Sequence, residues 1–512
     1  MKDGAGALRR SGVLATAMLM LMLARVASAS AEWTEVSSDH FVIYGTQPPA
    51  TLQEFAERLE LLHSAMTMAL QRPGTKPSPS NRVTVYVIPR PHQVAKLANV
   101  NQSNIAGVYS ARAGNSLAIV PPLHDTKSRL GSFRQLVLFH EYAHHFMATN
   151  SARAYPLWLI EGFAEFFGTA EIDEDTVKVG LPAELRAHGL LYEQLPLRFM
   201  LDYDGGRRAY DDESDVFYGR SWALFHMLFL ERREQLSKYL QLLAQGQPAL
   251  QAATVAFGNL DELDAVLQRY IRRPRMNHLY VARSQLTVGP IQVRALSPAE
   301  NAVMPARLRS HSGVTPQQAA EVVLEARAVA EKFPDEVTVL TELAEAEVDV
   351  ENYDAAVAPA DRALARDPTA INAWIQKGHA LTRKARNSAA TAETWTAVRN
   401  HWVRANKVEP NNPVPLFMYY WTFLEQETPA TANAVRGLEW ALALAPFDAD
   451  LRWTVAQQMI SEGRLALAAS TIAPLAYATH AGRPGAAKQL LEDIEAELQA
   501  QAAATSAASP GN

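Results

Sequence analysis

Apolar and polar positions alternate in two different ways over the first 150 residues. Apolar residues recur at helical spacing over 51–70 and again over 133–149, which predicts two helices. Shorter runs with strand character lie between and before them, at 41–44, 82–88, 108–109 and 116–120. This order of strands and helices predicts an α+β region that ends in a long helix. From about 155 to 285 the pattern is mainly helical.

The second half has a different pattern, rich in Ala and Glu and internally repeated. Pro334, Pro368, Pro410 and Pro446 each follow a helical stretch, at spacings of 34, 42 and 36 residues. A period of 34 is typical of the tetratricopeptide repeat, in which small residues let paired helices approach closely. The sequence therefore predicts an all-α tetratricopeptide-type superhelix over 316–496, with an insertion near 387–394. A generic helical domain is the alternative.

Two further segments bound these regions. Residues 291–315 are polar, contain proline and lack strong periodicity, which favours a linker between a domain at 33–290 and the repeats. We therefore expect the two halves to fold separately. The Ala- and Ser-rich end, 497–512, is predicted to be a disordered tail.

The first 29 residues have the layout of a signal peptide. Arg9 and Arg10 precede an apolar run of 11 residues, Val13 to Leu23, and Ala27-Ser28-Ala29 supplies small residues at a cleavage site. The alternative is a membrane anchor, but a span needs roughly 20 apolar residues. We expect an exported protein of a bacterial periplasm or exterior, with no stable membrane span after cleavage.

Composition narrows the chemistry. The 512 residues include no cysteine, which excludes disulfides, thiolate catalysis and cysteine-based zinc sites. The formal net charge is −6, and no basic stripe with interleaved aromatic residues is present. Nucleic acid is therefore not an expected partner.

The segment 140–144 reads His-Glu-Tyr-Ala-His within the predicted helix at 133–149. Residues four apart lie on one face of a helix, so His140 and His144 can reach one metal ion. Zinc held by neutral imidazoles keeps a water of lowered pKa, and Glu141 can take the proton of that water. The five-residue pattern also occurs by chance, so a third ligand is needed.

A second segment supplies that ligand. Residues 158–167 read Trp-Leu-Ile-Glu-Gly-Phe-Ala-Glu-Phe-Phe, with Glu161 and Glu165 four apart in an apolar helix. Burying bare carboxylates is costly unless they are paired or bind a metal. Glu161 can complete a His₂Glu site, and Glu165 can accept the spare N–H of a zinc-bound histidine. The alternative is two surface acids on an amphipathic helix, but the flanking residues leave little polar face.

These two segments, HEYAHH and WLIEGFAEFF, resemble the gluzincin zinc metallopeptidases. The closest resemblance is to the peptidase-MA-like bacterial proteins, which often carry tetratricopeptide repeats. The resemblance implies an α+β zincin-like catalytic domain, Zn²⁺ as cofactor, His140, His144 and Glu161 as ligands and Glu141 as the catalytic base. It is specific over 134–170 and looser over 33–285.

The chain departs from one related group. Around the same two helices it is also similar to the aminopeptidase and thermolysin families. However, it has no GxMEN-type segment, with which aminopeptidases hold the free amine of a substrate, and this argues against aminopeptidase activity. The hairpin at 107–120 is instead expected to bind a peptide as an added strand.

Four other residues could lie in or near the expected zinc site. Gluzincins often place a tyrosine downstream that donates to the developing oxyanion, and Tyr218 is our choice, with a packed aromatic residue as the alternative. Arg220 is predicted to bind a substrate carboxylate. His145 is expected to point away from the ion, and His226 to be a satisfied core residue.

The leading hypothesis is an exported zinc peptidase, an endopeptidase whose repeats recruit a polypeptide substrate or a protein partner. One alternative is a non-enzymatic tetratricopeptide scaffold with a vestigial zinc domain. Another is a cell-wall peptide amidase, because the chemistry at the carbonyl is the same.

Overall fold

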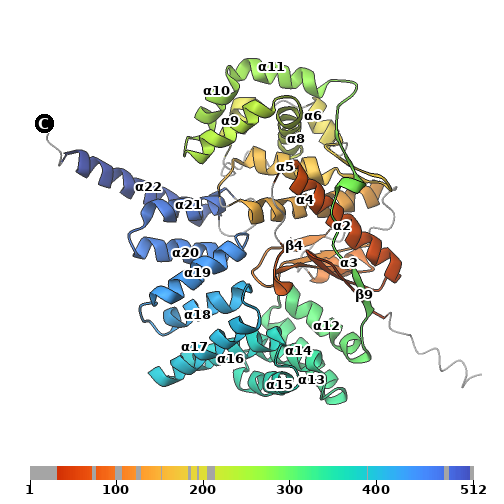
Figure 1. Cartoon of the computed structure of the whole chain (residues 1–512), viewed down its shortest axis with the longest axis vertical. Helices are drawn as coiled ribbons and strands as arrows, with labels where there is room; N and C mark the ends of the chain where they lie inside the picture. The colour runs from red at the N-terminus through yellow and green to blue at the C-terminus, as the bar shows by residue number, and fades with distance from the viewer. Residues whose placement is uncertain are drawn as a thin grey trace, which may run out of the picture.

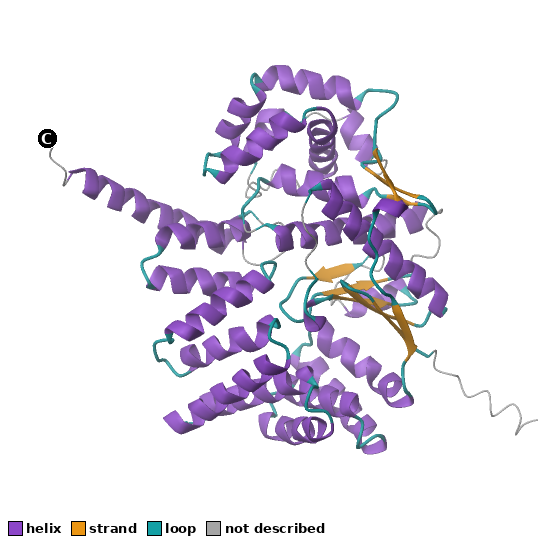
Figure 2. Cartoon of the chain, viewed as in Figure 1, coloured by secondary structure: helices purple, strands orange, loops and turns teal. Residues whose placement is uncertain are grey.

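The computed structural model describes residues 32–71, 76–97, 107–122, 129–151, 153–182, 186–192, 195–203, 214–388, 390–477 and 484–507. The expected signal peptide lies outside these residues. Among the helices that are described, none has the length and apolar character to cross a membrane. The chain comprises a mixed α/β region followed by a long all-α region of tetratricopeptide-like repeats (Figures 1 and 2).

A mixed sheet of six strands lies at the centre of the α/β region as far as it is described. Strands β2, β3 and β5 run parallel to one another, and Ile43, Val85 and Ala118 lie side by side across them, whereas β4, β1 and β9 pair in antiparallel fashion. Among the strands that are described, β4 pairs only with β5 and forms one edge of the sheet. The strands, in sheet order, are β4 (Val108–Ser110), β5 (Leu117–Val120), β3 (Val83–Val87), β2 (Phe41–Gly45), β1 (Thr34–Ser37) and β9 (Gln292–Ala295).

Helices cover both faces of this sheet because its strands carry apolar residues on both sides. One face, with Phe41 and Val83, packs into the main core with α2 (Pro49–Ala69) and α4 (Arg129–Asn150). The other face, with Tyr44 and Tyr86, packs on α3 (Pro91–Leu97) and α12 (Pro298–Ser312). The strands and the two helices expected over the first 150 residues are therefore present.

The remaining elements of this region extend the main core around α5 (Leu157–Gly168) and α8 (Ser214–Glu231). The other helices are α6 (Ala187–Tyr192), α7 (Leu197–Asp202), α9 (Arg233–Ala244), α10 (Ala249–Phe257) and α11 (Leu260–Ile271). A second, antiparallel sheet contains β6 (Glu171–Ile172), β7 (Thr176–Val179) and β8 (Leu279–Ala282).

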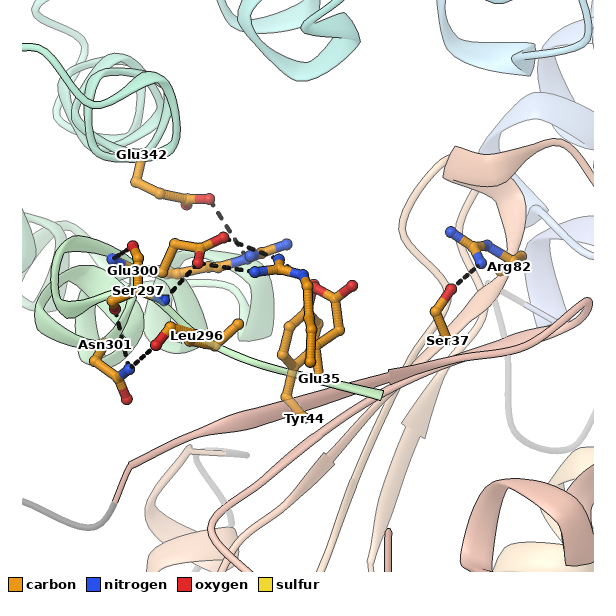
Figure 3. Close-up of polar contacts among 11 residues, drawn as sticks. Glu35, Ser37, Tyr44, Arg82, Leu296, Ser297, Glu300, Asn301 and Glu342 are labelled. Atoms are coloured by element: carbon orange, nitrogen blue, oxygen red, sulfur yellow. Dashed lines mark hydrogen bonds and ion pairs between the residues drawn. The ribbon is translucent and has the colours of Figure 1, made fainter. Parts of the chain in front are cut away.

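The segment 291–315, expected to be a linker, is structured. β9 pairs with β1 at the edge of the main sheet, and α12 buries Met304 and Leu308 against the face of that sheet. Ser297 and Glu300 cap α12 reciprocally (Figure 3). The linker prediction is therefore wrong. The residues of β9 are exposed and so show no periodic hydropathy, although the backbone of β9 pairs with β1 along its whole length.

Ion pairs also connect β9 and α12 to the sheet. Arg294 of β9 lies 2.7 Å from Glu35 of β1 and 2.8 Å from Glu300 of α12. Glu35 also accepts a hydrogen bond of 2.9 Å from Tyr44 (Figure 3). The first repeat helices are therefore joined to the α/β region by pairing, packing and charge together.

The all-α region consists of helices that pack as consecutive antiparallel pairs. Each of the four phased prolines follows the second helix of a pair, as expected. α16 and α17 have 17 residues each, whereas α14 and α15 have 13 and 14, so the expected insertion lengthens helices. The helices are α13 (Pro316–Lys332), α14 (Val337–Asp349), α15 (Tyr353–Arg366), α16 (Ile371–Asn387), α17 (Ala392–Val408), α18 (Pro413–Glu425), α19 (Ala432–Leu444), α20 (Ala449–Ser461), α21 (Leu465–Ala476) and α22 (Pro484–Ala507).

The final helix corrects the expected disordered tail. Residues 497–507 continue α22, because Ala, Gln and Glu favour helix even without a large apolar face. Residues 508–512 lie outside the described part of the chain.

The repeats curve around the α/β region and contact it a second time (Figure 1). The carboxylate of Glu409, just after α17, accepts hydrogen bonds from the backbone and side chain of Ser80, at 3.0 and 2.7 Å. The side chain of Asn81 donates to the carbonyl of Leu444 at 2.9 Å. The arc is thus attached at two places, through α12 on one face of the sheet and through the segments that follow α17 and α19, whereas α22 projects away (Figure 1).

Candidate metal centre

The centre lies where α4, α5 and α8 pack together. α5 is almost wholly buried, and its Gly162 allows the close approach to α8: a Cβ at this position would lie 2.4 Å from the carbonyl oxygen of Ser221. Gly168 faces His140 of α4 in a similar way, at 3.2 Å. Gly162 and Gly168 therefore let α5 pack closely against α8 and α4. This close packing brings the acids of α5 near the histidines of α4.

The structure brings the three predicted ligands together. Nε2 of His140 and Nε2 of His144 are 3.0 Å apart, and Oε2 of Glu161 lies 3.4 and 3.5 Å from them. Ligand atoms at about 2.0–2.1 Å from a tetrahedral zinc lie roughly 3.3 Å apart. The three atoms are therefore spaced as one zinc ion requires, and the residues present fit the metal.

The electrostatics of the group match its burial. Burial opposes ionisation of Glu161, which is fully buried, but His144 and His140 lower the pKa of its carboxyl well below the usual value. Burial likewise favours neutral His140, yet the contact with Glu161 outweighs it and raises the pKa of that imidazole. The carboxylate and imidazoles thus form a compact group that holds protons in the absence of a metal, and a divalent cation can displace these protons.

Glu165 lies one turn after Glu161 on α5 and is also fully buried. Its Oε1 is 3.5 Å from Nδ1 of His140, the nitrogen that does not face the candidate metal position. The same oxygen accepts hydrogen bonds from Arg186 at 2.9 and 3.2 Å, and Arg186 pairs with Asp215 at 2.5 Å. A charged chain therefore runs from the surface to the outer nitrogen of a candidate ligand.

Tyr218 on α8 also borders the group. Its ring centroid is 6.2 Å from that of His140, and the guanidinium of Arg186 lies 4.9 Å above its ring. Burial raises the pKa of the Tyr218 hydroxyl, and the negative charge of Glu161 raises it further. The hydroxyl therefore stays protonated and can act as a hydrogen-bond donor.

Arg220, two residues later, does not join the site. It is fully buried and its Nη2 lies 2.5 Å from Oδ1 of Asp264 on α11. Residues two apart point to different sides of a helix, so Tyr218 and Arg220 cannot both face the metal position. The substrate-binding role expected for Arg220 is corrected to a structural one.

The other two histidines lie as expected. His226 is fully buried and bonded to the hydroxyl of Tyr270 at 2.6 Å and the carbonyl of Gly180 at 2.9 Å. His145 is turned away from the group and hydrogen-bonded to the hydroxyl of Tyr109.

Glu141 and His144 face a cleft of about 420 Å³. Its other walls combine residues of the expected peptide-binding hairpin with residues that sequence reasoning missed. Tyr109 and Arg112 come from β4 and the turn after it, within that hairpin, whereas Phe447 and Asp448 come from the repeats. No sequence pattern links the repeat residues to the zinc motif, because their proximity arises only from the curvature of the repeat arc. Arg186 was also missed, because it is a single cation that no sequence pattern relates to Glu165.

A second group of metal-type side chains occurs at the junction with the repeats: His311, Glu342 and Glu345. Here the charges are already balanced, because Nε of Arg307 lies 3.4 Å from Glu342 and His311 lies 3.4 Å from Glu345. The other nitrogen of His311 is hydrogen-bonded to Tyr86 at 3.1 Å. We interpret this group as an ionic network between α12 and α14.

No known family model matches the chain, and no curated protein matches its sequence. Among solved structures, it is similar to a thermophilic tetratricopeptide-repeat protein of Thermus thermophilus, with 16% identity over 38% of this chain and 98% of that chain, at a TM-score of 0.31. It is also similar to a tetratricopeptide-repeat protein of Parabacteroides merdae, with 12% identity over 52% and 86% of the two chains, at a TM-score of 0.29.

Proposed function

We propose that this chain is an exported zinc-dependent peptidase that cleaves within extended polypeptides. The observation that carries the proposal is the spacing of the His140, His144 and Glu161 ligand atoms, with Glu141 beside them at the cleft. When bound, zinc would polarise the substrate carbonyl and lower the pKa of a water. The residues of the chain would do the rest.

Each remaining residue has a role that follows from its position. Glu141 takes a proton from the attacking water and delivers it to the leaving amine. Tyr218 donates a hydrogen bond to the negative charge that develops on the substrate oxygen. Glu165 orients the ring of His140 through its Nδ1, the nitrogen that faces away from the metal position. The outer edge of β4, which has no strand partner among the described residues, offers backbone groups to an extended peptide, and this favours cleavage inside a chain over removal of its end.

The test compares the wild type with Glu141→Gln in metal analysis and in the digestion of a peptide library. We expect about one zinc per chain in both proteins. Hydrolysis by the variant should fall roughly 10²- to 10⁴-fold, because the amide cannot accept the proton. His144→Ala is the control that should lose both metal and activity.

Three other outcomes are informative. Equal activity in wild type and Glu141→Gln would disprove the assigned base. Cleavage of cell-wall peptides but not of the polypeptide library would favour an amidase. Bound zinc without hydrolysis of either substrate would favour the scaffold.

A further inference from the structure

One wall of the cleft beside Glu141 and His144 belongs to the repeats. Residues 446–450, which join α19 to α20, line it together with Pro474 and Leu475 at the end of α21. The opposite wall comes from β4 and α4. The cleft therefore exists only where the two halves of the chain meet.

The wall formed by the repeats, residues 446–450 with Pro474 and Leu475, is fixed within the repeats by a buried arginine. Arg452 is 4% exposed and its guanidinium donates to the carbonyl of Pro446, with Nη2 at 2.5 Å and Nε at 3.2 Å. Its third hydrogen bond, of 3.1 Å, reaches the carbonyl of Thr471 on α21. The segment before α20 and the helix α21 are thus fixed relative to each other.

The same segment is also seated on the α/β region. Asp448 accepts a hydrogen bond of 2.7 Å from the backbone of Ala113, in the turn after β4. The ring of Phe447 lies 4.5 Å from that of His145, the residue next to the candidate ligand His144. The repeat wall therefore contacts both the turn after β4 and helix α4, which carries His140 and His144.

The surface of this wall is mainly apolar. Pro446, Phe447, Ala449, Pro474 and Leu475 line the cleft together with the charged Asp448, Asp450 and Arg452, and Met147 of α4 lines it from the other side. An apolar surface next to a site for backbone cleavage suits an apolar side chain of the substrate. A cavity of this kind distinguishes side chains by size, roughly 10- to 200-fold per methylene group at most.

We propose that the repeats form part of the substrate-binding site, in which residues 446–450 and the end of α21 accept an apolar side chain of a polypeptide adjacent to the scissile bond. This inference rests on the proposed peptidase function for the identity of the ligand. It assigns the repeats a direct role in specificity besides any recruitment of partners.

The probe for this pocket is a series of peptide hydroxamates that carry glycine, alanine, leucine or phenylalanine next to the zinc-binding group. Binding to the full, zinc-loaded chain is measured by calorimetry, so no turnover is needed. The wild type should bind the leucine compound at least about tenfold more tightly than the glycine compound.

Two substitutions should change this preference in opposite directions. Ala449→Trp fills the pocket and should abolish the preference for leucine while binding of the glycine compound is kept. Phe447→Ala enlarges the pocket and should shift the preference towards phenylalanine. Leu467→Ala is the matched control, because Leu467 is 50% exposed on α21 and does not line the cleft. Circular dichroism and zinc content confirm that each variant is folded.

An unchanged preference in folded, zinc-loaded Ala449→Trp and Phe447→Ala would overturn the inference, as would a wild type that binds every compound equally or not at all. The peptidase function is judged separately, by hydrolysis. A size preference that responds to both substitutions, in a protein that hydrolyses nothing, would support the pocket and reject the proposed activity.

Discussion

At the scale of single residues, the most informative side chain is Glu165. It has no solvent exposure, yet it lies between a candidate metal ligand, His140, and a cation, Arg186. A carboxylate in this position makes the histidine a better ligand and fixes its ring, while the arginine offsets the cost of burying the carboxylate. On the proposed function, Glu165 therefore acts on the metal through His140 without contacting it.

We expect Glu165→Ala to weaken zinc affinity by about 10- to 100-fold without abolishing binding. Competition with a chelator measures the effect. Asp215→Ala is the matched control, because it removes the other, exposed partner of Arg186 and should leave the affinity unchanged. An affinity equal to wild type in Glu165→Ala would show that the 3.5 Å contact does not orient the ring of His140.

Sequence reasoning performs well for the part of the site that follows helical spacing. His140, Glu141 and His144 lie within two turns, and the acids of α5 follow with the same period. The partners of these residues are different: Arg186 reaches Glu165 from another segment, and no periodicity relates the two. Arg220 shows the opposite error, because its sequence neighbour Tyr218 lies near the candidate metal position whereas Arg220 faces Asp264.

At the scale of elements, the site depends on the close packing of α5 against α8. Gly162 follows Glu161 directly, and the space for its absent side chain is occupied by the backbone of Ser221. Any change in the distance between the two helices therefore moves the carboxylate of Glu161 relative to the histidines of α4.

We predict that Gly162→Ala destabilises the chain by about 1–3 kcal/mol, because the added methyl group would overlap a backbone carbonyl that cannot move away easily. Zinc affinity should also fall, since α5 carries Glu161. Gly437→Ala on α19 is the control: its nearest contact would be 3.8 Å, so it should be tolerated. Chemical denaturation of the metal-free proteins checks the stability, and equal midpoints for all three proteins would contradict the packing argument.

Elements with one buried face could be predicted from the sequence, and β9 could not. Its four residues are all exposed, so they show none of the alternation that marks β2 or β3. What holds β9 is backbone pairing with β1 and the ion pairs of Arg294, which leave no pattern in hydropathy. The repeats could be predicted from the spacing of their prolines, because each proline follows the end of a helix at the same place in its unit.

At the scale of the whole molecule, residue 290 does not mark a structural boundary. β9 completes the sheet of the α/β region, and α12 covers one face of it. Separate folding of the two halves stays a prediction, but a fragment that ends at residue 290 leaves this edge and this face uncovered.

We expect a fragment of residues 32–290 to be less stable than one of residues 32–313 by several kcal/mol. The shorter fragment loses the burial of Leu296, Met304 and Leu308, each worth about 1.5–3 kcal/mol, together with the pairing of β9. Urea denaturation of the two purified fragments is the measurement. Coincident unfolding curves would mean that β9 and α12 contribute nothing to the sheet.

The pairing of β1 with β9 also sets an order of events during synthesis. Residues 34–37 must wait for residues 292–295 before the sheet can close, and such distant contacts form slowly. The candidate ligands are all made by residue 161, but the cleft gains its last wall only when residue 475 has been added. A nascent chain therefore carries the candidate ligands before it carries the complete cleft. On the proposed function, a substrate side chain can be bound in this cleft only after residue 475 has been made.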